Sequence, residues 1–141
     1  TAQIDVSDVW EVRRTIEVET AALAARNATP EQCARIVELT ELMSPDDVDK
    51  GPDTETDIAF HLAIADACGN ALFRQIFVSF VPLMRDSVPK AWETRQTQQE
   101  RVDIINLHRT LAAAIARGDA DEARRNMVAH FDESIGVLLR A

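Results

Sequence analysis

The stretch TDIAFHLAIADACGN, residues 56–70, decides the fold class of this chain. From Ile58 to Ala65 it is apolar on nearly every side of a helix, which predicts a helix buried among other helices. Gly69 suits the left-handed position that follows a helix, and Asn70 can cap the next helix. The stretch therefore predicts the buried central helix of an all-helical domain.

The same helix carries a carboxylate and an imidazole on one face. Asp57 and His61 are four residues apart, so their side chains leave the helix one turn apart. The other two histidines are His108 in VDIINLHRTLAAAI and His130 in RRNMVAHFDESIGVLL, and each shares a stripe with apolar residues. Three imidazoles and one carboxylate are enough to enclose a divalent metal ion. A second interpretation stays open, in which these groups are hydrogen-bonded core residues.

The rest of the chain shows repeated helix signals and no strand pattern. Pro82 should kink or end the fourth helix, because proline removes a backbone donor and clashes with the preceding turn. The stretch SPDDVDKGPD, residues 44–53, is the one clear loop. We predict an all-α fold, an antiparallel bundle of about six helices in one domain over residues 1–141. The expected helices run from a Ser7 cap to about Ala28, from a Thr29 cap to about Met43, from about Thr54 to Cys68, from an Asn70 cap towards Arg85, from Glu93 or later to Gly118, and from an Asp119 cap to the C-terminus.

Charge and cysteine content exclude several classes of protein. The net charge of −9 argues against a nucleic-acid surface, because neutralising phosphates needs clustered Lys and Arg. Cys33 and Cys68 lie far apart and suit reduced thiols in a cytoplasmic protein. The sequence shows no signal peptide and no apolar run long enough for a membrane span.

Three segments resemble one known family. The string DIAFHLAIADACGN of residues 57–70, the string HRTLAAAIARGDADEARRNMVAH of residues 108–130 and the opening WEVRRTIE of residues 10–17 are similar to the FCD domain. This is the FadR C-terminal, effector-binding domain of GntR-family bacterial transcription regulators. The resemblance covers essentially the whole chain.

The resemblance implies an all-helical sensor that follows an N-terminal winged helix-turn-helix DNA-binding domain and forms a homodimer. Many family members hold a divalent metal through one Asp and three His, and the matching positions here are Asp57, His61, His108 and His130. This implies the metal-binding branch of the family, with zinc as the first choice and nickel or manganese as alternatives. The acidic residue that often precedes the second histidine is Leu107 here, which is not a ligand position.

The winged helix-turn-helix is absent from these 141 residues. Either the chain is an excised effector domain, or it acts without DNA, and the start at Thr1 favours excision. We therefore expect contact with DNA only through the absent domain, and none with membranes.

Arg13 is the first candidate for binding the effector. It falls between Val9 and Ile16 on the apolar stripe of its helix, and a buried guanidinium needs an anion. The resemblance places it at the pocket, whereas an ion pair with Glu17 on the next turn is the structural alternative. Arg85 is a weaker candidate, because its charged head can reach solvent.

The charge of the metal site indicates the class of effector. A divalent ion with one carboxylate and three neutral imidazoles keeps a net charge near +1 and has open positions if it is octahedral. A small organic carboxylate can fill them, such as a hydroxy acid, a dicarboxylate or a sugar acid.

The alternative function is a metal-dependent hydrolase or transferase on a DinB-like bundle, in which the ion activates water or a thiol. The sequence has no HExxH and no obvious general base, so we expect no enzyme. A metal-free interaction module is the third reading, and it leaves the inward histidines unexplained.

Overall fold

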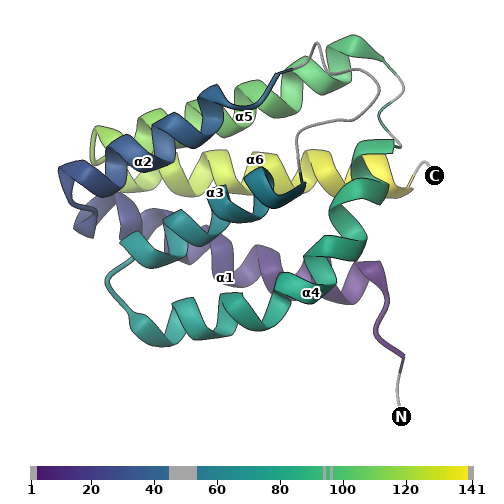
Figure 1. Ribbon diagram of the computed structural model, residues 1–141, viewed down its shortest axis with the longest axis horizontal. Coiled ribbons are helices and arrows are strands. Elements are labelled where there is room, and N and C mark those ends of the chain that lie inside the picture. The colour runs from purple at the N-terminus through teal and green to yellow at the C-terminus, as the bar shows by residue number, and fades with distance from the viewer. Residues whose placement is uncertain (1–2, 45–53, 94, 96, 140–141) are drawn as a thin grey trace.

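The protein is described here from a computed structural model, which covers residues 3–44, 54–93, 95 and 97–139. Six helices follow one another, and these residues contain no strand (Figure 1). This confirms the predicted all-α fold. The helices are α1 (Val6–Asn27), α2 (Pro30–Glu41), α3 (Thr54–Ala67), α4 (Ala71–Glu93), α5 (Gln98–Ala116) and α6 (Ala120–Leu139).

The start of α1 differs from the prediction. Asp5 and not Ser7 caps the helix: its side chain accepts a hydrogen bond from the Asp8 amide, and the Asp8 side chain accepts one from the Asp5 amide. Ser7 instead donates its hydroxyl to the Asp5 carboxylate at 2.6 Å. The predicted Ser7 cap is therefore wrong, because an aspartate two residues earlier forms a reciprocal capping box.

Two other helix boundaries follow their predicted signals. Thr29 caps α2 in a capping box with Gln32, and Pro30 occupies the first turn. Gly69 and Gly118 have φ angles of +82° and +75° after α3 and α5, which is the left-handed conformation that glycine adopts without strain. The predicted loop of residues 44–53 lies, apart from Ser44, outside the described residues.

Helix α4 runs further than predicted. It contains both Pro82 and Pro89 and ends at Glu93, not near Arg85. Figure 1 shows α4 changing direction along its length, as expected where proline interrupts the backbone hydrogen bonds. Pro82 therefore does not end the helix.

Helix α3 is buried on two sides. Phe60 and Ile64 belong to the main core, which α3 shares with α1, α2, α5 and α6. Ile58 and Ala65 belong to a smaller cluster with Phe77 of α4. This confirms the buried helix predicted from residues 56–70 and explains why it lacks a single polar face.

Candidate metal centre

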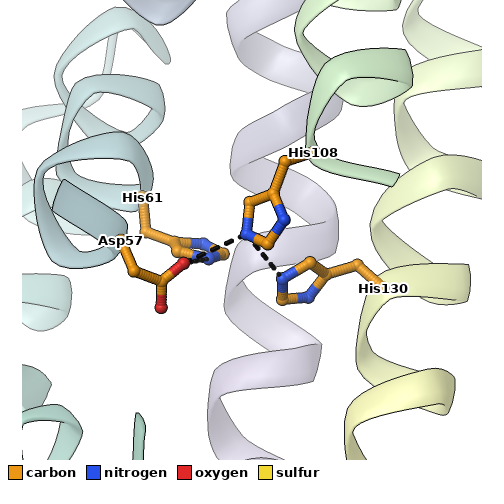
Figure 2. Close-up of side chains that lie close together, drawn as sticks. All are labelled: Asp57, His61, His108 and His130. Carbon is orange, nitrogen blue, oxygen red and sulfur yellow. Dashed lines mark hydrogen bonds and ion pairs between the residues drawn. The ribbon is translucent and has the colours of Figure 1, made fainter. Parts of the chain in front are cut away.

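Three helices bring the four predicted ligands together. Asp57 and His61 project from α3, His108 from α5 and His130 from α6, and Figure 2 shows the four side chains converging on one point. One ligand atom from each residue lies within 4.8 Å of those from the other three. The four positions predicted from the sequence therefore form one cluster.

The distances suit a single ion. Asp57 Oδ1 lies 3.0 Å from His108 Nε2 and 3.6 Å from His61 Nε2, and His130 Nε2 lies 3.2 Å from His108 Nε2. Two atoms that bind one ion at about 2.1 Å are about 3.0–3.4 Å apart at octahedral or tetrahedral angles. These three spacings are close to this range, and all four ligand atoms lie within 4.8 Å of one another, so the side chains would close further around a bound ion.

The three histidines of the cluster are buried, whereas Asp57 is partly exposed. His61, His108 and His130 are 1%, 5% and 6% exposed. Buried polar atoms normally have hydrogen-bond partners, yet His61 Nε2 and His130 Nδ1 have none among the described residues. A cation at the convergence point would give His61 Nε2 a partner, so the donor set fits a metal ion.

A hydrogen bond at Nδ1 of His108 orients the ring so that its other nitrogen, Nε2, faces the cluster. His108 Nδ1 lies 2.7 Å from the backbone oxygen of Ile104, which only accepts hydrogen bonds, so Nδ1 carries the proton and donates. With a metal ion in the cluster, Nε2 would then present its lone pair to the ion. Metal-binding histidines commonly use this arrangement, in which the second nitrogen donates to an oxygen outside the site.

Three of the four groups have shifted pKa values when no cation is bound. Burial lowers the pKa of His130 well below its usual range, and the neighbouring His108 and His61 add to this effect. Burial also opposes the charged form of His61, but the carboxylates of Glu17 and Asp57 outweigh it and raise its pKa to about 9. Burial raises the pKa of Asp57, and contacts with His108 and His61 outweigh this and hold it well below the usual range.

A pocket adjoins the cluster. Its volume is about 180 Å³, and Asp57, His108 and His130 form part of its wall. The wall also includes residues from the second half of α4, from Ser87 to Glu93. A metal ion held by the cluster would therefore face the pocket on one side.

Arg13 also lines this pocket, as the resemblance implied. It is 8% exposed, and its Nε donates to Glu17 Oε2 at 2.7 Å, so the predicted structural ion pair is present. One terminal nitrogen, Nη2, is buried without a hydrogen-bond partner among the described residues. The guanidinium lies 5.1 Å from the centre of the Phe131 ring.

Arg85 lies elsewhere. It is not among the residues that line the pocket, and its guanidinium pairs with Glu55 at 2.8 Å on the surface. Both side chains are more than half exposed. A role for Arg85 in effector binding stays a prediction, and its position favours the surface pair.

Two charged residues at the site were not found from the sequence. Glu17 is 2% exposed and contacts His61, although it was considered only as a partner of Arg13. Arg95 is 4% exposed, lines the pocket and donates to Glu133 at 2.8 Å. Nothing in the local sequence marks Arg95, because its burial depends on the α4–α5 connection meeting α6.

The described residues thus form an all-helical bundle with a buried Asp-His cluster and an adjoining pocket. The chain belongs to the FCD domain family, whose model matches residues 8–133. The resemblance inferred from the sequence is thus confirmed.

Among curated proteins, the chain is 30% identical over 138 residues to the HTH-type transcriptional regulator LutR of Bacillus subtilis, covering 95% of the chain and 62% of LutR. It is 33% identical over 125 residues to an Escherichia coli regulatory protein of the L-lactate dehydrogenase operon, covering 88% of the chain and 48% of that protein. The chain therefore spans about half to three fifths of the length of these relatives.

Among solved structures, the fold matches McbR/YncC of Escherichia coli with a TM-score of 0.81 at 19% identity, covering 99% of this chain and 68% of that one. The curated relatives are named as transcription regulators, and the chain shares the FCD domain with this family, in agreement with the expectation of no enzyme. No helix among the described residues is long and apolar enough to cross a membrane.

Proposed function

We propose that this domain is a metabolite sensor that binds one divalent metal ion and one small organic carboxylate. The ion is held by Asp57, His61, His108 and His130, and the carboxylate enters the adjoining pocket. One observation carries the proposal: three of the four ligand residues also form the wall of the pocket. A molecule in the pocket can therefore touch the ion directly.

The charge at the site favours an anion. A divalent cation with the single Asp57 carboxylate and three neutral imidazoles has a net charge near +1. The bound ion supplies a Lewis-acid position for a carboxylate oxygen. Arg13 lies on the same wall: its Nε pairs with Glu17, and its buried Nη2 lacks a partner that an acid or hydroxyl oxygen would provide.

The volume of the pocket limits the size of the effector. A cavity of about 150 Å³ holds benzene, which has six non-hydrogen atoms. The 180 Å³ pocket therefore suits a carboxylate with about six to nine such atoms. Short hydroxy acids and dicarboxylates fit this limit, whereas a six-carbon sugar acid would extend beyond it through the open side of the pocket. One relative is named for the L-lactate dehydrogenase operon, and lactate is within the limit.

The regulatory output is the remaining part of the proposal. In the full-length regulator, a winged helix-turn-helix domain precedes this chain, the protein is a homodimer, and effector binding changes the affinity of that domain for DNA. For this to occur, the effector must bind two arrangements of the protein with different affinity. Zinc is the first choice of metal, with nickel and manganese as alternatives.

Metal analysis combined with thermal melting tests the proposal. We expect about one transition-metal ion per chain after purification without chelator. A carboxylate at one hundred times its dissociation constant adds about 2.7 kcal/mol, or roughly 5–10 °C in Tm, and should do so only for the metal-loaded domain. Absence of metal after incubation with zinc, nickel and manganese would refute the metal site. Equal shifts with and without metal would refute direct coordination of the carboxylate.

A further inference from the structure

Glu17 is a buried carboxylate that contacts both Arg13 and His61. It lies on α1, is 2% exposed, and its two carboxylate oxygens have different partners. Oε2 accepts a hydrogen bond from Arg13 Nε at 2.7 Å, and Oε1 contacts His61 Nδ1. Glu17 thus bridges a residue of the pocket wall and a residue of the metal cluster.

The contact between Glu17 and His61 has no substitute nearby. Beyond this ion-pair contact, neither Glu17 Oε1 nor His61 Nδ1 has a hydrogen-bond partner in the described part of the chain. Both atoms are fully shielded from water, and leaving either one alone carries a large desolvation cost. Each of these two atoms therefore depends on the other for its polar contact.

Apart from Asp57, whose Oδ1 lies 3.6 Å from Nε2, the other neighbours of the His61 ring include three phenylalanines. Phe60 meets the ring edge at a centroid distance of 5.4 Å, and Phe77 and Phe131 lie at 6.5 Å and 6.4 Å. These apolar contacts restrict the ring plane, but they distinguish a ring nitrogen from a ring carbon only weakly. A half-turn about the Cβ–Cγ bond would exchange these positions. Glu17 favours one of the two orientations, because only a ring nitrogen can donate to its carboxylate.

We infer that Glu17 is the positioning residue of the metal centre: held by Arg13, it accepts the Nδ1 proton of His61 and so directs Nε2 towards Asp57, His108 and His130. The inference rests on the proposed metal site. A ligating histidine whose outer nitrogen donates to a carboxylate has a fixed tautomer and a more basic inner nitrogen, and such outer partners contribute about 10–100-fold to metal affinity.

Two substitutions distinguish the effect of the position of the Glu17 carboxylate from the effect of its charge. Glu17→Gln keeps the length of the side chain and an acceptor oxygen but removes the charge. Glu17→Asp keeps the charge but shortens the reach, so the contact with His61 is lost. Glu19→Gln is the matched control: it removes the same charge from the same helix at a surface residue, whose carboxylate pairs with Arg124 at 3.4 Å.

Zinc affinity is measured by competition with a chromophoric chelator for the wild type and the three variants. Both Glu17 variants should bind zinc about 10–100-fold more weakly, while the Glu19 variant matches the wild type. Far-UV circular dichroism of each metal-free variant checks that the helices remain. Nitrogen-15 NMR of the zinc-loaded wild type should show His61 protonated at Nδ1 and coordinated at Nε2.

Wild-type affinity in either Glu17 variant would overturn the positioning role, and so would His61 coordinated through Nδ1. Loss of affinity in the Gln variant alone would assign Glu17 a purely electrostatic effect and also overturn it. If the wild type and the Glu19 variant bind no zinc, the proposed metal site fails and this inference fails with it. A Glu17 variant that binds like the wild type leaves the proposed metal site standing.

Discussion

The metal-free domain should lose stability as the pH rises from neutral to alkaline. The pKa of His61 is raised to about 9 in the fold, whereas an unfolded histidine titrates near 6.5. A raised pKa stabilises the fold fully below about pH 6.5, and this contribution disappears as the pH passes through about 9. At about 1.4 kcal/mol per pKa unit, the full change is roughly 3 kcal/mol, or on the order of 10 °C in Tm.

The measurement is the melting temperature of the chelator-treated domain between pH 6 and 9.5, followed by circular dichroism. His61→Gln is the control variant, because it keeps a polar side chain but cannot titrate, and it should flatten this alkaline decline. Zinc-loaded protein should also lack the decline, since the ion replaces the Nε2 proton. An equal alkaline decline in the wild type and the control variant would refute the assignment to His61.

Three further predictions use other parts of the structure. His108→Ala should remove the metal from purified protein by elemental analysis while the helical circular dichroism signal remains, because the surrounding core is apolar; unfolding of the variant would contradict this. Residues 1–141 alone should not shift duplex DNA at physiological salt with or without effector, owing to the charge of −9. Hydrogen exchange over residues 78–92 should slow when the effector binds, because this part of α4 reaches the pocket wall beyond Pro82, and unchanged protection would exclude it as the responding element.

Much of the fold follows from local signals in the sequence. The apolar run in α3, the Thr29 capping box and the glycines after α3 and α5 act within one or two helical turns, so each could be recognised without the tertiary structure. The end of α4 could not, because a helix continues through proline when tertiary packing compensates for the lost hydrogen bond. The choice of Ser7 as cap failed because Asp5 and Ser7 both suit the position, and only Asp5 forms the reciprocal pair with Asp8.

The candidate site was only partly predictable for a related reason. Metal ligands are few and chemically distinctive, so three inward histidines and one aspartate stood out. Glu17 did not, because a glutamate four residues after an arginine is common on exposed helices. Its contact with His61 arises only when α1 packs against α3, and its burial is visible only in the assembled bundle.

Helix α1 connects the pocket, the metal centre and the N-terminal end of the domain. Its Arg13 lines the pocket, its Glu17 contacts the proposed metal ligand His61, and its Trp10 donates to the backbone oxygen of Phe131 on α6 at 2.7 Å. In the proposed full-length regulator, the DNA-binding domain precedes this helix. An effector that engages Arg13 while it coordinates the ion would therefore act on α1 at two points a single helical turn apart. In that regulator, α1 would therefore be the element that joins the effector pocket to the DNA-binding domain.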